Sequence, residues 1–369
     1  MTDIMASPIG RTDQPVLKEG PRLRQLDGMR GLAALSVFVF HCGLIPQFWN
    51  NSSHFPGILG DGRAAVDLFF VLSGFVLARS LLGDRSAGYL AFIVKRIARI
   101  YPAYWTALLL CAVLIPMYDA NSHPFFDKLT RGFWARPAGW EQWFLHFSLV
   151  APGIDRGRIN GVIWSLIIEM RISLCMPFLV WLCCSLPVRG RLILFSLACP
   201  VFMLLGQTAA FVPLFLIGIL LAIHFQSNGT VSRVTLLSLF LVGGLFYGNR
   251  EIGDLPFRQE TGSVSDLLSG IGAGILIFVA IKSSLCERFL TTLPVQFLGD
   301  VSYSFYLLHW PILLYITSCL LVAGYSPMMC AALSLTASWI SAYLAFLYIE
   351  KPGMKLGSRL AAQMVTPVR

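Results

Sequence analysis

Ten segments of mostly apolar residues follow one another along almost the whole chain, and they constrain its fold more than any other feature. An α-helix needs about 20 predominantly apolar residues to cross a bilayer. Only 13% of the residues are charged, whereas soluble domains carry roughly 25%, so too little polar surface is left to cover a water-soluble globule. We therefore predict an all-α fold, a polytopic membrane bundle of about ten transmembrane helices. They are expected at 29–48, 64–82, 97–117, 162–186, 191–206, 209–226, 232–248, 265–282, 300–323 and 327–350.

The remaining residues divide the chain simply. Residues 1–25 are polar and rich in proline, which predicts a disordered cytoplasmic segment before a membrane domain at 26–352. Residues 140–151 are apolar but too short to span, so we expect them at the interface or re-entering the bilayer. Residues 353–369 are expected to form a cytoplasmic tail.

The Lys and Arg residues predict the orientation. If the N-terminus is placed in the cytoplasm, most of the 28 Lys and Arg residues fall in cytoplasmic loops and at cytoplasmic helix ends. This follows the positive-inside rule and, with an even number of spans, places both termini in the cytoplasm. The net charge of +9 is thereby explained without a nucleic-acid partner. The nine cysteines of the chain show no zinc-ligand spacing, so no metal site is expected.

The first apolar segment contains the most suggestive pair of ionisable residues, Arg30 and His41. They are eleven residues apart, which in a helix brings them to within roughly 20° of one face and about 16 Å apart along the axis. Arg30 would lie at the cytoplasmic boundary and His41 well inside the membrane. A neutral imidazole can accept a proton from a hydroxyl and act as a general base. The alternative is a histidine that only joins two helices through a hydrogen bond.

The second and third segments each contribute a polar group. Asp67 lies near the start of the second segment. It can pair with an arginine or orient a histidine, or it is simply an acidic residue that the helix dipole favours near a helix start. Ser73 and Gly74 suit close helix packing. Arg96 and Arg99 share a face at the start of the third and can clamp a phosphorylated ligand, or merely anchor the helix at lipid headgroups.

The fourth and ninth segments complete the set. Glu169 and Arg171 lie two residues apart inside an apolar helix, so they point to different sides and each needs a partner from another helix, unless both lie at the outer interface. Tyr303, Tyr306 and His309 share one face of the ninth segment. His309 can contact substrate or support the bundle.

Five stretches together resemble the membrane-bound acyltransferase family 3, whose members O-acylate sugars and glycan polymers. In order they are LDGMRGLAALSVFVFHCG, VDLFFVLSGFVL, KRIARIYPAYW, WSLIIEM and YSFYLLHWPI. The resemblance covers roughly residues 25–352, so 26–352 would be the acyltransferase domain. Many relatives add a soluble SGNH-type esterase domain, and this chain looks like the self-contained form.

The resemblance implies roles for individual residues. His41 and Arg30 match the family's catalytic pair, and Arg96 and Arg99 match a basic motif that would bind acyl-CoA. The remaining matches, in substrate-binding or supporting roles, are Asp67, Ser73, Glu169, Tyr303 and His309. The usual second acidic position after Glu169 is Met170 here, which departs from the pattern.

The resemblance implies a multi-pass inner-membrane O-acyltransferase. Acyl-CoA, for which we expect acetyl-CoA, would be the donor, with no tightly bound cofactor. The acceptor would be a hydroxyl of a sugar or lipid-linked glycan. His41 would deprotonate that hydroxyl or carry the acyl group transiently. The alternative functions are a transporter or flippase for glycans or lipids, and a receptor-like bundle without chemistry.

Overall fold

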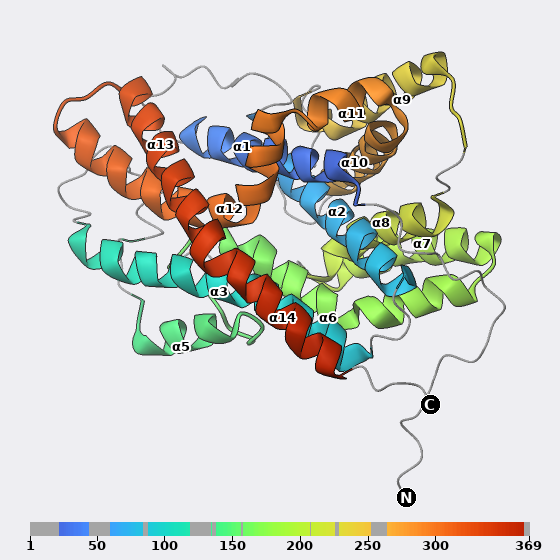
Figure 1. Cartoon of the computed structure of the whole chain (residues 1–369), viewed down its shortest axis with the longest axis horizontal. Helices are drawn as coiled ribbons and strands as arrows, with labels where there is room; N and C mark the ends of the chain where they lie inside the picture. The colour runs from blue at the N-terminus through green and yellow to red at the C-terminus, as the bar shows by residue number, and fades with distance from the viewer. Residues whose placement is uncertain are drawn as a thin grey trace, which may run out of the picture.

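The chain folds into a bundle of helices (Figure 1), and the described residues contain no strand. The structure, a computed structural model, describes residues 22–43, 60–83, 88–118, 134, 138–155, 158–206, 208–225, 229–251 and 264–364. In chain order the helices are α1 (Arg24–Gly43), α2 (Gly62–Gly83), α3 (Tyr89–Met117), α5 (Trp140–Ser148), α6 (Ile163–Ser185), α7 (Val188–Leu204), η5 (Ala209–Phe211), α8 (Val212–His224), α9 (Arg233–Tyr247), η6 (Asn249–Glu251), α10 (Val264–Lys282), α11 (Ser284–Leu290), α12 (Leu293–Val322), α13 (Pro327–Ala345), η7 (Phe346–Glu350) and α14 (Lys351–Met364). The predicted all-α class is confirmed for this part of the chain.

Six helices of the described residues are long and apolar enough to cross a membrane: α2, α3, α6, α10, α12 and the continuous helix formed by α13, η7 and α14. The other four predicted spans do not meet this criterion of length and apolar composition. The first two turns of α1 carry Arg24, Asp27 and Arg30, and α7, α8 and α9 have fewer than 18 residues each. The prediction of ten spans is therefore supported for six segments, and the other four stay predictions.

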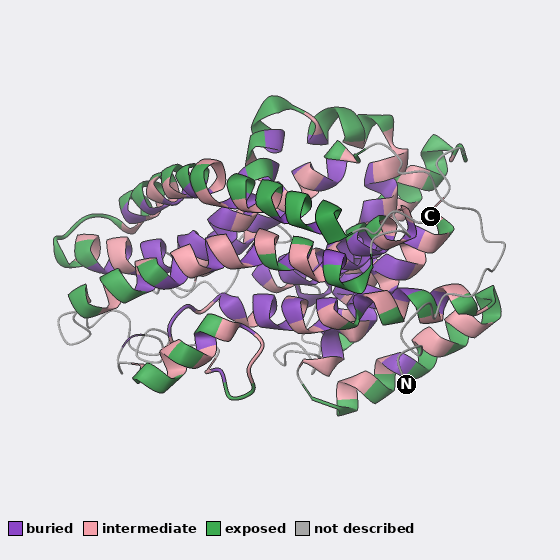
Figure 2. Cartoon of the chain, turned by 60° about the horizontal axis from the view of Figure 1, so that its bottom comes forward, coloured by how far each residue is buried: buried purple, intermediate pink, exposed green. Residues whose placement is uncertain are grey.

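The outer faces of the bundle suit a lipid environment. Large apolar side chains are exposed on α7 and α9, although both helices are short; examples are Leu192 and Leu197, and Leu237 and Leu241. Figure 2 shows buried residues gathered in the middle of the bundle and exposed ones on its outer helices. Because lipid tails are as apolar as leucine, these faces need no protein cover in a membrane.

Helices α1 and α12 run side by side in the same direction, held together by small residues. A Cβ added to Gly31 would lie 2.5 Å from the backbone nitrogen of Gly299, so only glycine permits this approach. Further along, the rings of Phe38 and Phe305 are 5.9 Å apart. This register brings the polar residues of α1 against those of α12, which is how the candidate site is assembled.

Helices α2 and α8 form a second parallel pair. A Cβ on Gly74 would meet the carbonyl oxygen of Phe215 at 2.3 Å, and Gly218 lies equally close to the backbone of α2. The rings of Phe70 and Phe215 are 5.5 Å apart. If successive segments cross the membrane in alternating directions, the first and ninth (α1 and α12) run in the same direction, and so do the second and sixth (α2 and α8). The contacts above show these same directions. Which face is cytoplasmic stays a prediction.

The predicted C-terminal tail is helical as far as Met364, because α14 continues α13 through the π-helical turn η7. Pro352 lies two residues after the end of this turn and cannot donate the backbone hydrogen bond of a regular α-helix. Gly353 and Gly357 of α14 pack closely on Ala98 of α3. Helix α3 begins eight residues before the predicted start at 97, since the charges at 95 and 96 interrupt the apolar run but not the helix.

The short segment predicted at 140–151 forms helix α5, which is too short to span. Its C-terminal carbonyls accept hydrogen bonds from neighbouring helices. The hydroxyl of Tyr104 donates to the backbone oxygen of His146 at 2.7 Å, and Arg171 donates to that of Ala151 at 2.6 Å. The sequence predicted a partner for Arg171 from another helix; its partners are instead Val150, Ala151 and Thr208, which lie outside the helices, so Arg171 holds the chain after α5.

Candidate active site

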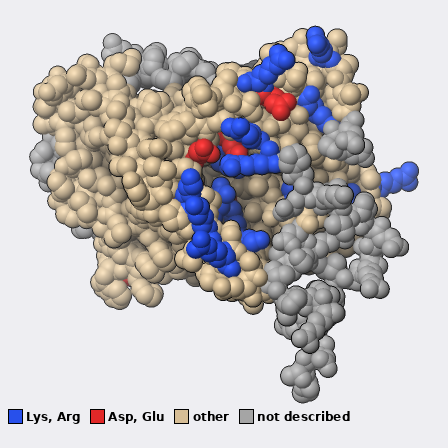
Figure 3. Space-filling view, in the orientation of Figure 1, with Lys and Arg blue, Asp and Glu red and all other residues tan. Residues whose placement is uncertain are grey.

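A cavity of about 260 Å³ opens between α1, α2, α3, α6 and α12. Its wall combines aromatic and apolar side chains with a concentrated set of charges and hydroxyls. The polar groups include Arg30, Ser73, Lys95, Arg96, Arg99, Ser165, Glu169, Ser302, Tyr303 and Tyr306. Figure 3 shows Lys and Arg side chains gathered around a hollow in the middle of one face of the molecule. The fold therefore brings together six of the nine residues to which the resemblance assigned roles: Arg30, Ser73, Arg96, Arg99, Glu169 and Tyr303.

Arg96 and Glu169 form an ion pair across the cavity wall. A guanidinium nitrogen of Arg96 lies 2.6 Å from a carboxylate oxygen of Glu169 and also donates to the hydroxyl of Ser173 at 2.9 Å. The same Glu169 oxygen accepts from the hydroxyl of Ser73 at 2.9 Å. The Arg96 side chain is only 9% exposed, and the Glu169 carboxylate compensates its charge. This pair therefore joins α3 to α6 and α2.

Arg99 lies one helical turn further along α3 and has a different environment. It is half-buried, lines the cavity, and makes no hydrogen bond to another described residue. Arg30 also lines the cavity, and its guanidinium contacts Asp27 at 3.3 Å, a single long contact. With Lys95, these residues surround the cavity with positive charge. An arrangement of this kind suits phosphate groups, which arginine binds through paired hydrogen bonds.

His41 and His309 meet at the far end of the α1–α12 interface. The Nδ1 atom of His41 and the Nε2 atom of His309 are 2.9 Å apart, and Nδ1 of His309 lies 3.1 Å from the carbonyl oxygen of Phe305. A carbonyl only accepts, so Nδ1 of His309 donates to it. In the neutral pair, Nε2 of His309 then accepts from Nδ1 of His41. This leaves the lone pair on Nε2 of His41, the form that a general base requires.

The two polar regions lie on the same two helices. Arg30 and His41 both face α12, whose Tyr306 lines the cavity while its ring is 5.9 Å from that of His309. About 16 Å of helix axis separates Arg30 from His41. Tyr303 lines the cavity as well, and its hydroxyl donates to the backbone oxygen of Ile100 at 2.8 Å. Neither histidine lines the cavity itself.

Comparison with known proteins agrees with this geometry. A family model described as an acyltransferase domain matches residues 23–349. The chain belongs to this acyltransferase family. It is 27% identical to the peptidoglycan O-acetyltransferase OatA of Listeria monocytogenes, over 90% of this chain and 56% of that protein. It is 24% identical to the O-acetyltransferase OatA of Staphylococcus aureus, over 91% of this chain and 58% of that protein. No solved structure matches.

The chain thus spans a little more than half the length of these curated relatives. Family membership confirms the resemblance that the five sequence stretches indicated. Among the described residues, no group of three or more His, Cys, Asp or Glu side chains is placed to hold a metal ion.

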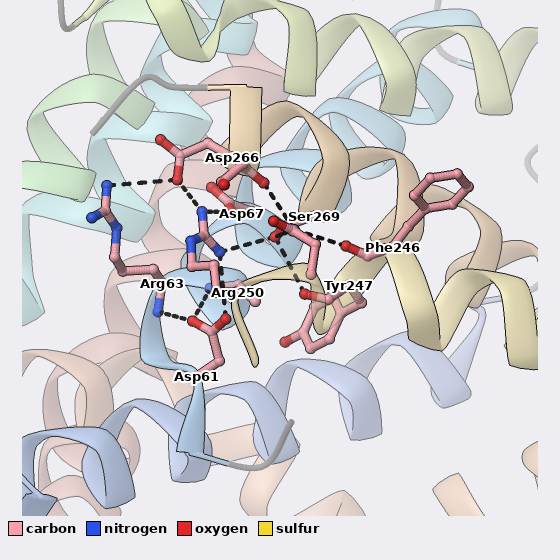
Figure 4. Close-up of polar contacts among 11 residues, drawn as sticks. Asp61, Arg63, Asp67, Phe246, Tyr247, Arg250, Asp266 and Ser269 are labelled. Carbon is pink, nitrogen blue, oxygen red and sulfur yellow. Dashed lines mark hydrogen bonds and ion pairs between the residues drawn. The ribbon is translucent and has the colours of Figure 1, made fainter. Parts of the chain in front are cut away.

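Asp67, which the resemblance placed among the supporting residues, does not line the cavity between α1, α2, α3, α6 and α12. It is buried against Arg250 at 3.2 Å, together with Asp61 at 3.5 Å and Asp266, which makes a shorter contact. Figure 4 shows these three carboxylates converging on Arg250 from α2, its N-terminal cap and α10. Arg250 also donates to the hydroxyl of Ser269 at 2.9 Å. In the described structure, Asp67 pairs with an arginine and does not orient a histidine.

Sequence reasoning missed several polar residues that this family member buries. Arg250 lies outside the predicted spans, in a loop where an arginine is expected to be solvated, so the sequence contains no signal for it. Asp266 and Glu350 lie just inside the ends of predicted segments. An acidic residue within a predicted membrane segment is the signal that could have found them. Glu350 is 2% exposed and accepts a hydrogen bond from Ser304 of α12 at 2.7 Å.

Proposed function

We propose that this protein is an inner-membrane O-acyltransferase that moves an acetyl group from acetyl-CoA to a sugar hydroxyl of a cell-surface or exported glycan. Membership of the acyltransferase family supports the reaction class. The observation that carries the proposal is the arrangement along α1 and α12. A cavity lined with cations lies at one end of the interface and a histidine with a free ring nitrogen lies at the other.

The cationic end suits the phosphates of acyl-CoA. Arg99 and Arg30 are positioned to bind them, and each charge-assisted contact is worth about 1.5–3 kcal/mol. In CoA, a long flexible arm separates the phosphates from the thioester. The separation of about 16 Å between Arg30 and His41 accords with a donor whose phosphates and reactive carbonyl are far apart. This argument supports acyl-CoA over a small donor.

The histidine end supplies the proton transfer. Nε2 of His41 takes the proton of the sugar hydroxyl as its oxygen attacks the thioester carbonyl. The carbon–sulfur bond breaks, and the CoA thiolate leaves and receives the proton. His309 acts as a positioning residue, because its hydrogen bond holds His41 in the tautomer with a free Nε2. The same geometry allows Nε2 to attack the thioester first and carry the acyl group.

The acceptor is assigned only by class. The Listeria relative is named for peptidoglycan, so a cell-wall polymer or its lipid-linked precursor is a reasonable first substrate to test. A transporter or flippase for glycans or lipids would share the helical bundle. It needs neither an acyl donor nor a histidine whose tautomer is fixed by a second histidine.

The test is transfer of label from radioactive acetyl-CoA into the glycan fraction of isolated membranes. His41→Gln should reduce transfer by about 10²–10⁴-fold, the usual contribution of a general base, at unchanged protein level. His224→Gln is the matched control, because His224 is exposed on α8 and lies apart from the cavity lining. Near-normal transfer by His41→Gln would exclude His41 as base and as nucleophile. No transfer by the wild-type chain to any glycan would favour the transporter.

A further inference from the structure

The C-terminal helix α14 forms a surface that the acyl-transfer reaction does not use. We propose that α14 lies at the membrane surface and binds the headgroups of anionic phospholipids. This inference does not depend on the proposed function. It rests on the length of the helix, on the arrangement of its side chains and on its charge.

The length of the helix requires α14 to leave the hydrocarbon. The continuous helix from Pro327 to Met364 has 38 residues. At 1.5 Å per residue it is about 57 Å long, whereas the hydrocarbon core of a bilayer is about 30 Å thick. Even at a tilt of about 40°, the upper end of the range for transmembrane helices, it extends about 44 Å along the bilayer normal, so a large part of it lies at or beyond the interface. The polar residues are concentrated in α14, so this is the part that emerges.

The side chains of α14 form stripes along the helix, each repeating every four residues. The small residues Gly353, Gly357 and Ala361 face α3, where Gly357 contacts Ala98 closely. The next stripe, about 100° around the helix, is apolar and exposed: Leu356 is 56%, Leu360 41% and Met364 48% exposed. A protein contact among the described residues therefore covers the first stripe and leaves the second open.

The third stripe is basic and borders the apolar one. It consists of Lys351, Lys355 and Arg359, which are all exposed and make no hydrogen bond or ion pair within the described residues. Helix α14 contains no Asp or Glu, so its charge is uniformly positive. In Figure 1, α14 crosses the face on which Figure 3 shows the Lys and Arg side chains gathered.

An apolar stripe beside a basic one suits a helix segment at the boundary between hydrocarbon and headgroups, where the continuous helix leaves the membrane. The apolar side chains enter the region between headgroups and acyl chains, while the basic side chains reach the phosphates. The apolar stripe favours a lipid over free phosphate or CoA, neither of which would cover three adjacent aliphatic side chains. Each Lys or Arg near an anionic membrane surface strengthens binding about fivefold, so three of them give a clear preference for anionic lipid.

The preference can be measured on the full-length chain by native mass spectrometry. The chain would be released from bilayers containing phosphatidylglycerol and phosphatidylcholine in equal parts. The ratio of the two lipids retained reports the selectivity. Wild type should retain phosphatidylglycerol in preference, by about tenfold or more. Changing Lys351, Lys355 and Arg359 together to Gln should remove most of this preference.

A charge-matched control separates a specific surface from net charge. It changes Arg189, Arg233 and Arg288 together to Gln; these residues are exposed on α7, α9 and α11. The control should keep the wild-type preference. An equal loss in both triple variants, or no loss in the α14 variant, would overturn the proposal. If the α14 triple variant does not insert, Lys355→Gln alone should lower the ratio about fivefold, and an unchanged ratio there would also overturn it.

Discussion

Arg96 and Arg99 are one helical turn apart on α3, yet the structure predicts opposite consequences for their removal. Arg96 is 9% exposed and pairs with Glu169 at 2.6 Å. Arg99 lines the cavity without a hydrogen-bond partner in the described chain. We expect Arg96→Ala to destabilise the fold, and Arg99→Ala to weaken donor binding while leaving the fold intact.

The magnitudes follow from what each change leaves behind. Without Arg96, the Glu169 carboxylate, whose side chain is 22% exposed in the cavity wall, keeps only the hydrogen bond from Ser73. Breaking a fully buried ion pair from one side typically costs about 3–5 kcal/mol, so we expect a cost of about 3 kcal/mol or less for this partly buried pair. Without Arg99, one phosphate contact worth about 1.5–3 kcal/mol is lost, which corresponds to an increase of roughly tenfold to a hundredfold in the KM for acetyl-CoA.

The assay combines thermal unfolding of the purified chain in detergent with acetyl-transfer kinetics. A double change of Arg96 to Met and Glu169 to Leu serves as the control, because it removes both charges and should recover much of the stability lost in Arg96→Ala. The reasoning is refuted if Arg96→Ala unfolds at the wild-type temperature. It also fails if Arg99→Ala lowers stability as much as Arg96→Ala does.

Three further predictions concern packing, the second charge cluster and pH. Gly31→Ala should lower stability strongly, because its Cβ would meet the backbone of α12 at 2.5 Å, whereas Gly244→Ala, with nothing within 4 Å, should be neutral or mildly stabilising by thermal unfolding. Arg250→Met should leave three buried carboxylates without their shared cation and cost about 3–5 kcal/mol; wild-type stability at neutral pH would contradict this. Burial lowers the pKa of His146 on α5, against the opposing effects of its backbone hydrogen bond and Asp155. The unfolded chain therefore binds this proton more readily, so stability should fall as pH drops below about 6.5, and His146→Gln should make the unfolding temperature less sensitive to acid.

The sequence predicted the existence of the helices well and their bounds less well. Residues 162–186 and 265–282 became α6 and α10 almost to the residue, because polar residues or proline flank each mostly apolar segment on both sides. The start of α3 and the helical tail were missed. In both places charged residues interrupt the apolar pattern, while a neighbouring helix supplies the packing that keeps the backbone helical.

The candidate site residues could be named from the sequence, but most of their structural partners could not. Arg30 and His41 could be placed on one face by counting residues along a helix. The pairing of Arg96 with Glu169 joins residues 73 positions apart, and that of Asp67 with Arg250 joins residues 183 apart. Nothing in the local pattern shows that Arg96 is neutralised and that Arg99, one turn away, is open to the cavity.

The sequence by itself determined that this chain forms membrane helices with polar groups at particular heights. A spanning helix satisfies its own backbone hydrogen bonds, so length and hydropathy are enough to specify it. Only the tertiary structure decided which polar groups meet. His41 reaches His309, 268 residues away, because Gly31 and Gly299 let α1 and α12 approach closely and so set their rotation and register. Contacts of this kind depend on the crossing of two helices, which no single segment of sequence specifies.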